Sequence, residues 1–263
     1  MVTLSTLRFG ILGFGNLGSL IVRCLIAVGV PVENIFAVER SSNKRVIEEL
    51  GVVPIRDGQF SKVDVLICST KPAQFEAAWQ ALAFPQGGPS LVISFMAKGS
   101  LADLAIITGA QNIVRAMTST PCVIGKGVGA WIAASALEDT QRETAEALLT
   151  ALGTHIQAQS EEEIAFATVL SSVNGMVFEL LYALEKAMNY IGAPRRYQAL
   201  VVTVLESALA YRRFRNATHP SGLVDEVASP AGTTVQMRYV FDRAGIPAVF
   251  ADMVRAAYEK VRG

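Results

Sequence analysis

Residues 7–18 have the sequence LRFGILGFGNLG, an apolar run followed by three spaced glycines. The run over residues 7–12 predicts a strand buried on both faces, and the apolar residues of 16–28 predict a helix that begins inside the glycine pattern. A strand, a GxGxxG loop and a helix in this order are typical of a domain that binds a dinucleotide. The stretch therefore predicts an α/β fold with an N-terminal doubly wound sheet of the Rossmann type.

Each glycine of the loop has a physical role in this interpretation. Gly13 permits a tight turn, Gly15 lets backbone N–H groups approach a pyrophosphate, and Gly18 allows the helix to pack closely on the strand. The alternative is a glycine turn that serves packing alone. The residues of the loop predicted to contact the dinucleotide are Gly13, Phe14, Gly15, Asn16, Leu17 and Gly18.

Residues beyond the second predicted strand bear on the choice of dinucleotide. Glu39 lies about 20 residues after the motif, where a carboxylate hydrogen-bonds the ribose of NAD and repels a 2′-phosphate. The residues that follow it, from Arg40 through Ser41 to Lys44, suit a phosphate instead. Alternatively, Arg40 and Lys44 form the solvated first turn of a helix. We expect NADPH to be preferred, with NADH possible, and Glu39, Arg40 and Ser41 to contact the cofactor.

The rest of the first half continues the alternation of strands and helices. The first domain is expected to span residues 1–160. Its other strands are predicted at 34–38, 64–68, 91–95, 112–117, 127–134 and 155–158, and its other helices at 42–50, 72–82, 100–107 and 138–152.

From residue 161 onward the pattern becomes helical and apolar to the C-terminus. A second, all-helical domain is therefore expected at residues 161–263, with helices at 161–191, 194–214, 233–244 and 247–261. The chain is 51% hydrophobic and 17% charged, which exceeds the apolar share of an average soluble domain. A helical domain this apolar is expected to bury part of its surface against a partner.

Charge and cysteine content exclude several classes of partner. With 23 Lys and Arg against 23 Asp and Glu, the chain has no net field to attract nucleic acid or an anionic membrane. The apolar stretch 9–32 contains several glycines and Arg23, which argue against a membrane span or a signal peptide. Three cysteines without CxxC spacing predict neither a disulfide framework nor a metal site. We expect a cytoplasmic protein that binds no metal.

Four motifs, in chain order, are similar to those of one enzyme family. Residues 69–72 (STKP) resemble A-V-K-P, residues 92–97 (VISFMA) resemble V-S-I-A-A-G, and residues 115–121 (RAMTSTP) resemble R-A-M-P-N-T-P. Residues 219–234 (HPSGLVDEVASPAGTT) resemble H-P-x-x-L-x-D-x-V-x-S-P-G-G-T-T. The chain thus resembles the pyrroline-5-carboxylate reductases, which make proline by reducing a cyclic imine.

The resemblance implies a cofactor, a partner and a set of cofactor contacts. It implies NADPH as the cofactor, a cyclic imino acid as the substrate, and a homodimer or an assembly of dimers joined through the helical domain. The residues that it adds to the cofactor site are Ser69, Thr70, Lys71, Pro72 and Ser119.

The resemblance also implies where the substrate binds. Its carboxylate would dock on the turn that contains Ser229, Gly232 and Thr233, and Thr234 would act as the catalytic residue by hydrogen-bonding the imine nitrogen. From the residues alone, 229–234 is a helix start that Ser229 can cap, with free N–H groups that suit a carboxylate. An ordinary capped helix is the alternative.

Departures from the family motifs leave other functions open. The family's S-G-S-G-P-A-Y is represented only by residues 170–176 (LSSVNGM), and Ala231 replaces a glycine. One alternative is a reductase of a related ring, such as a piperideine-carboxylate or a substituted pyrroline, in a specialised pathway. An alternative of another class is a regulatory protein that binds the cofactor without turnover.

Overall fold

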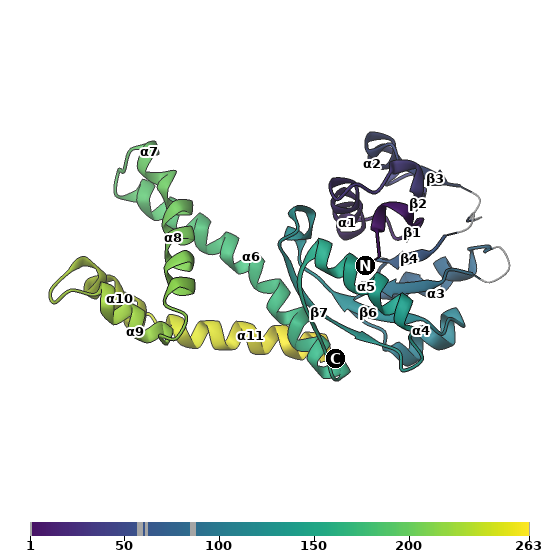
Figure 1. The fold of residues 1–263 in the computed structure, drawn as a ribbon. Helices are drawn as coiled ribbons and strands as arrows, with labels where there is room; N and C mark the ends of the chain where they lie inside the picture. Colours follow the sequence, from purple (N-terminus) through teal and green to yellow (C-terminus); the bar gives the residue numbers. More distant parts are fainter. Residues whose placement is uncertain (1, 57–59, 61–62, 85–87, 263) are drawn as a thin grey trace. The chain divides into compact units, whose positions relative to one another are not determined.

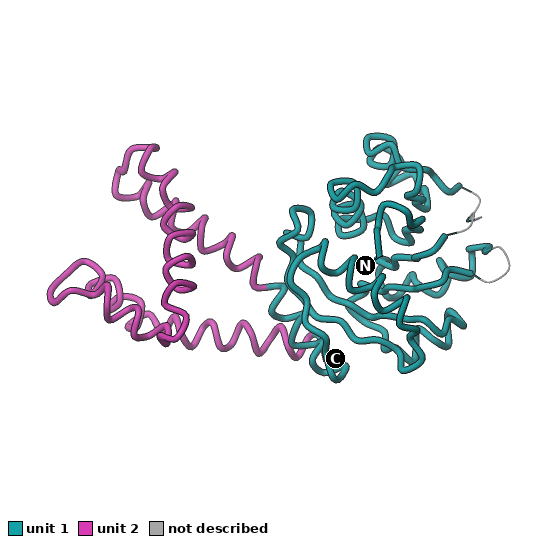
Figure 2. The backbone as a smooth tube through the Cα atoms, viewed as in Figure 1, with its two compact units in different colours: residues 1–172, 261–263 teal, residues 173–260 magenta. Residues whose placement is uncertain are grey.

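The computed structural model describes residues 2–56, 60, 63–84 and 88–262. The chain divides into two compact units (Figure 2): Met1–Ser172 with Val261–Gly263 form unit 1, and Val173–Lys260 form unit 2. The boundary expected after residue 160 coincides with the start of a long helix, α6 (Glu161–Tyr190). The first turns of α6 belong to unit 1.

In unit 1 the described residues form a sheet of eight strands (Figure 1). The strand order is β3-β2-β1-β4-β5-β6-β7-β8, and all neighbours are parallel except β6 and β7. Strands β1, β4, β5 and β6 are buried along their whole length, which explains their continuous apolar runs. The strands are β1 (Phe9–Leu12), β2 (Ile35–Val38), β3 (Val53–Ile55), β4 (Val65–Cys68), β5 (Leu91–Ser94), β6 (Ile113–Met117), β7 (Gly127–Ala133) and β8 (Gly153–Gln157).

Helices cover both faces of the sheet, as a doubly wound fold requires (Figure 1). One core cluster packs α1 and α5 onto the sheet through Leu25 and Leu148, and a second packs α3 and α4 onto it through Phe75 and Leu104. The predicted fold class is confirmed. The helices of unit 1, besides the first turns of α6, are α1 (Asn16–Ala27), α2 (Lys44–Leu50), α3 (Pro72–Gln80), α4 (Leu101–Thr108) and α5 (Asp139–Leu152), with short 3₁₀ turns at Leu4–Thr6, Val32–Asn34 and Thr120–Ile124.

Two local features show what sequence patterns can and cannot detect. Ser100 and Asp103, three residues apart, form a capping box at the start of α4: the Ser100 hydroxyl accepts the Asp103 N–H, and the Asp103 carboxylate accepts the Ser100 N–H. Strand β3 was not predicted, because it has only three residues and contains Pro54. It lies at the edge of the sheet beyond β2, where proline is tolerated.

The start of α6 is fixed to the sheet by a partly buried ion pair. The Arg115 guanidinium, on β6, binds the Glu161 carboxylate and also donates to the Ala97 carbonyl (3.3 Å). The other carboxylate oxygen of Glu161 accepts the Leu101 N–H (2.8 Å). Ile164, one turn later, is buried in a third apolar cluster. These contacts make the first turns of α6 part of the core of unit 1.

Unit 2 consists of helices that have almost no core of their own. Among its described residues, Val201 is the only one that is buried. The helix predicted at 194–214 divides at Ala199, and the short helix α9 was not predicted. The elements are the remainder of α6, α7 (Arg195–Gln198), α8 (Leu200–Phe214), α9 (Pro220–Val227), α10 (Thr233–Arg243) and α11 (Ile246–Arg262).

Among the described residues, α6 is the one helix long and apolar enough, by length and composition only, to cross a membrane. Its first turns pack against protein, with Ile164 and Ala167 buried beside Met117 and Ala130. Helices at large subunit interfaces have the same apolar composition.

Candidate functional site

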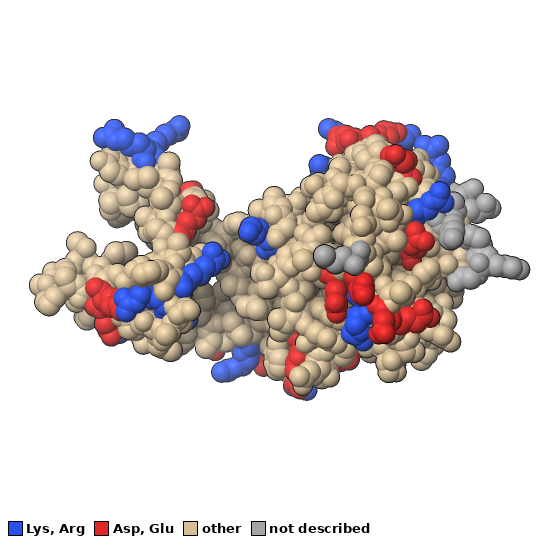
Figure 3. Space-filling view, in the orientation of Figure 1, with Lys and Arg blue, Asp and Glu red and all other residues tan. Residues whose placement is uncertain are grey.

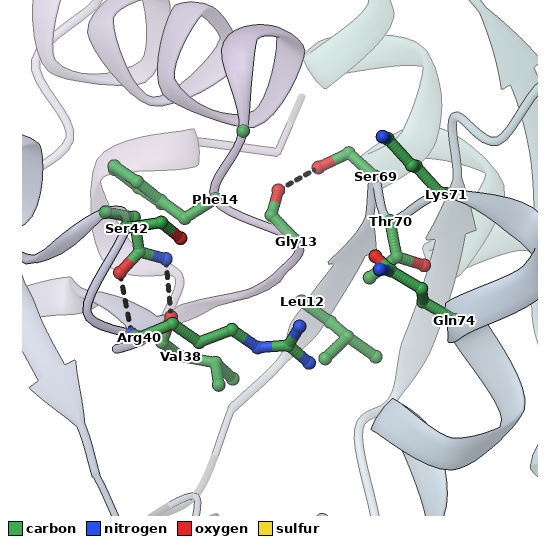
Figure 4. Close-up of a pocket in the computed structure, with 12 residues that line it drawn as sticks. Leu12, Gly13, Phe14, Val38, Arg40, Ser42, Ser69, Thr70, Lys71 and Gln74 are labelled. Atoms are coloured by element: carbon green, nitrogen blue, oxygen red, sulfur yellow. Dashed lines mark hydrogen bonds between the residues drawn. The ribbon is translucent and has the colours of Figure 1, made fainter.

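A cavity of about 270 Å³ lies at the carboxyl ends of β1, β2 and β4 (Figure 4). The strand order reverses between β1 and β4, and ligands of open α/β sheets bind at such a reversal. The predicted glycine loop, the segment after β2 and the loop after β4 meet here. The lining residues are Leu12, Gly13, Phe14, Gly15, Val38, Arg40, Ser42, Asn43, Ser69, Thr70, Lys71 and Gln74.

Two of the loop's glycines are required by packing within the chain. Gly13 has a φ of +98°, and a Cβ there would lie 2.4 Å from the Thr70 nitrogen. A Cβ on Gly18 would lie 2.3 Å from the Gly13 carbonyl oxygen. The Ser69 hydroxyl donates to that same carbonyl (2.6 Å), so it holds the glycine loop against the β4 side of the cavity (Figure 4).

Gly15 differs, because no packing contact among the described residues requires a glycine there. Among the described residues, and apart from those adjacent in the chain, no heavy atom lies within 4 Å of the position that a Cβ would occupy. Gly15 is also the N-cap of α1, and no side chain caps this helix. The exposed N–H groups of an uncapped helix start attract an anion, and open space beside them lets a phosphate approach the backbone. These residues therefore fit the pyrophosphate of a dinucleotide.

The segment after β2 is shaped by Asn43, whose side chain is buried. Its amide oxygen accepts the Arg40 N–H (2.7 Å), and its amide nitrogen donates to the Val38 carbonyl (3.0 Å). Figure 4 shows the Arg40 side chain extending across the cavity toward Leu12. Lys44, in contrast, pairs with Glu48 on α2 (3.9 Å) and does not line the cavity. Arg40 is thus the cation of this segment that faces the site.

The cavity collects part of the predicted cofactor set: Gly13, Phe14, Gly15, Arg40, Ser69, Thr70 and Lys71. Ser119 is buried, and its hydroxyl accepts the Val128 N–H (3.0 Å). The sequence analysis did not predict Gln74 as a lining residue. Its position three residues after Lys71, in the first turn of a predicted helix, could have indicated that both lie on the same side. The predicted residues that do not line the cavity are Asn16, Leu17, Gly18, Glu39, Ser41, Pro72 and Ser119.

The turn before α10 carries the predicted substrate residues. The prediction that Ser229 caps this helix is wrong, because Gly232 is the N-cap and no side chain caps it. Gly232 is needed for packing, since a Cβ would lie 2.4 Å from the Ser229 hydroxyl. Ala231 adopts a φ of +60°, a left-handed conformation that suits the glycine of the family motif better than an alanine. The backbone N–H groups of Thr233 and Thr234 remain at an uncapped helix start, and Thr234 is half-buried.

Two family models match the chain. One, described as pyrroline-5-carboxylate reductase dimerisation, matches residues 161–263, and the other, described as NADP oxidoreductase coenzyme F420-dependent, matches residues 8–98. The chain is 28% identical to the pyrroline-5-carboxylate reductase of Aquifex aeolicus, covering 98% of this chain and 97% of the relative. It is 27% identical to that of Pseudomonas aeruginosa, covering 98% and 96%. Along nearly its whole length the chain is thus similar to the pyrroline-5-carboxylate reductases.

Solved structures of pyrroline-5-carboxylate reductases have the same fold. The enzyme from Coxiella burnetii matches with a TM-score of 0.79 and 26% identity, covering 98% of both chains. The Plasmodium falciparum enzyme, solved with NADP bound, matches with a TM-score of 0.85 at 20% identity, covering 98% of this chain and 97% of that one. The resemblance of the sequence motifs to this family is confirmed.

The two histidines and the buried Cys68 and Cys122 lie outside the glycine-loop cavity. Burial lowers the pKa of His155, which favours its neutral form. The His219 ring accepts the Ser221 N–H (3.3 Å) and so caps α9. Burial raises the pKa of the Cys122 thiol to about 11 and that of Cys68 still further, so both thiols stay protonated at neutral pH. None of these four side chains lines the glycine-loop cavity.

Proposed function

We propose that this chain is an NADPH-dependent reductase that converts 1-pyrroline-5-carboxylate to proline. The observation that carries the proposal is the similarity, along nearly the whole chain, to curated pyrroline-5-carboxylate reductases. The open position at Gly15 supports a dinucleotide, and the uncapped start of α10 supports a substrate carboxylate.

The residues of the glycine-loop cavity would hold the cofactor. The N–H groups at the start of α1 would bind the pyrophosphate, with Gly15 leaving room for it. Arg40 would pair with a 2′-phosphate, and Lys71 would add a second cation at the opposite wall. When bound, NADPH supplies a hydride for the imine carbon. The full set proposed is that of the sequence prediction, with Asn43 and Gln74 added from the cavity lining.

The turn before α10 would hold the substrate. Its uncapped N–H groups, at Thr233 and Thr234, would bind the carboxylate without a cationic side chain. The Thr234 hydroxyl would hydrogen-bond the imine nitrogen and orient the ring. A protonated imine already carries its proton, so reduction at carbon yields the neutral ring amine without an acid from the protein. This fits a chain in which burial favours the neutral form of His155 and the His219 ring caps α9.

The assay that tests the proposal follows NADPH oxidation with a panel of cyclic imines. The panel contains five- and six-membered rings, each with and without a carboxylate, and NADH replaces NADPH in a parallel series. We expect the five-membered ring with a carboxylate to react fastest. Ala231 and residues 170–176 depart from the family motifs, so a six-membered or substituted ring is the second candidate. Binding of NADPH without turnover of any imine would point to a regulatory protein.

Arg40→Ala is expected to weaken NADPH binding while leaving NADH binding nearly unchanged. The Arg40 side chain lies in the cavity, and its charge pairs only with a cofactor that carries the 2′-phosphate. Loss of a charge-assisted pair lowers affinity by roughly tenfold or more. Fluorescence titration with each dinucleotide measures this. Equal losses for both would mean that Arg40 does not distinguish them.

Dimerisation through unit 2 is part of the proposal. Its helices expose many large apolar side chains, and Figure 3 shows wide areas without charged side chains on the visible face. A surface of this kind is stable in water only when it is covered. A cytoplasmic location is also proposed, since free buried cysteines such as Cys68 stay reduced there. Exposed apolar residues of unit 2 include Phe178, Val204, Phe214, Met237, Tyr239 and Val240.

Light scattering at micromolar concentration is expected to give at least twice the 28.1 kDa chain mass. Phe178→Asp, on a 60% exposed residue of α6, should shift the mass toward that of the monomer. Ile106→Asp is the matched control, since Ile106 is 82% exposed but lies on α4 in unit 1. A stable monomer of the unaltered chain would contradict the proposal.

A further inference from the structure

An ion pair joins the ribose-reading position to a residue that sequence patterns did not single out. Strands β2 and β3 run parallel, with Val38 beside Ile55, so Glu39 and Arg56 follow them side by side. The Arg56 Nε donates to one carboxylate oxygen of Glu39 (3.1 Å), and its Nη2 donates to the other (3.4 Å). The Glu39 N–H also donates to the Ile55 carbonyl (2.8 Å). Glu39 is therefore held by both its backbone and its side chain.

This pair lies in a second cavity next to the glycine loop. The cavity has a volume of about 590 Å³ and shares Leu12, Val38, Arg40 and Gln74 with the first. Its remaining lining combines the Glu39 and Arg56 side chains with the apolar face of α3. Glu39 is only 13% exposed, whereas Arg56 is 67% exposed. The Glu39 carboxylate thus lines the cavity next to the glycine loop but is covered by the Arg56 side chain.

Arg56 makes the charges around the second cavity more favourable to an anion. A carboxylate alone at the ribose-reading position accepts the hydroxyls of an unphosphorylated ribose and repels a 2′-phosphate. Arg56 occupies both oxygens of Glu39 and balances its charge. Lys44 and Glu48 pair with each other and cancel. The positive charge of Arg40 is then not balanced by Glu39, and it can pair with a phosphate dianion at the cavity wall.

We infer that Arg56 determines cofactor specificity: by holding Glu39 in a two-point ion pair, it makes an acidic ribose-reading position admit a 2′-phosphate. Arg56 acts through Glu39 and is a positioning residue. The inference rests on the proposed function, because it presumes a dinucleotide cofactor in the glycine-loop cavity.

Direct binding of NADPH and NADH, measured by fluorescence titration, tests the inference without turnover. Arg56→Leu is expected to weaken NADPH binding by at least about tenfold and to tighten NADH binding, because the Glu39 carboxylate is released. Arg45→Leu is the matched control: Arg45 pairs with Glu49 on the surface of α2 (2.7 Å) and lines neither cavity, so both affinities should persist. Circular dichroism verifies the fold of each variant.

A double variant separates action through Glu39 from direct contact with the phosphate. In Glu39→Gln/Arg56→Leu the repelling carboxylate is gone, so NADPH affinity should return to within about threefold of the unaltered chain. A loss that persists in the double variant would mean that Arg56 binds the phosphate itself, which overturns the inference alone. An unchanged preference in Arg56→Leu would also overturn it alone. If the unaltered chain binds neither dinucleotide, that result contradicts the proposed function as well as this inference.

Discussion

Gly15→Val is expected to abolish dinucleotide binding while leaving the fold intact. The backbone of Gly15 has φ −90° and ψ −156°, an extended conformation that valine adopts readily. No described atom beyond the adjacent residues lies within 4 Å of the new Cβ, so the side chain would extend into the space beside the α1 N-terminus. A pyrophosphate could then not reach the backbone N–H groups. Titration with NADPH, together with a thermal melt, measures both outcomes.

Gly18→Ala gives the contrasting control. Its Cβ would lie 2.3 Å from the Gly13 carbonyl oxygen and 2.8 Å from the Ser69 hydroxyl, so this variant should lower the melting temperature. The two substitutions are thus expected to have different effects: Gly15→Val blocks ligand binding, and Gly18→Ala disturbs packing. A folded Gly15→Val protein that binds NADPH normally would show that the loop serves packing alone.

Thr234→Val is expected to lower kcat/KM for the preferred imine by roughly ten- to a hundredfold. The substitution keeps the shape of the side chain and removes the hydroxyl proposed to hydrogen-bond the imine nitrogen. Losing a hydrogen bond to a charged group costs about 1.5 to 3 kcal/mol. NADPH affinity and the melting temperature should not change. Steady-state kinetics and a cofactor titration on the same preparation test these expectations.

Thr233→Val is the neighbouring control, with a smaller expected loss. Both threonines lie in the first turn of α10, but Thr233 is exposed and Thr234 is half-buried. Valine keeps the backbone N–H at either position, so carboxylate binding should persist in both variants. If the Thr234 variant reduced the imine as fast as the unaltered chain, the substrate would have to bind elsewhere.

About half of the site was predictable from the sequence, namely the part built by neighbours in the chain. The glycine loop, the loop at Ser69–Lys71 and Arg40 each follow a strand that its own apolar run reveals. The carboxyl ends of parallel strands meet at one edge of the sheet, so their loops had to converge. Asn43 could not be assigned in this way, because its role in the turn depends on side-chain hydrogen bonds to Arg40 and Val38.

The sequence by itself determined the elements whose signals are local. The order of strand, glycine loop and α1, the capping box of α4 and the apolar helices after residue 161 all depend on residues a few positions apart. Hydrophobic period, capping chemistry and glycine spacing act over that range, and each is visible in the chain.

Only the tertiary structure decided the contacts between distant residues and the choice among competing caps. Strand β3 has no periodic signal of its own, so nothing local indicated that Arg56 would lie beside Glu39. The N-cap of α10 is Gly232 and not Ser229, because Ala231 has a positive φ and the helix begins only after it. Pairing between strands and backbone geometry are properties of the folded chain, and these placed the groups expected to select the cofactor and hold the substrate.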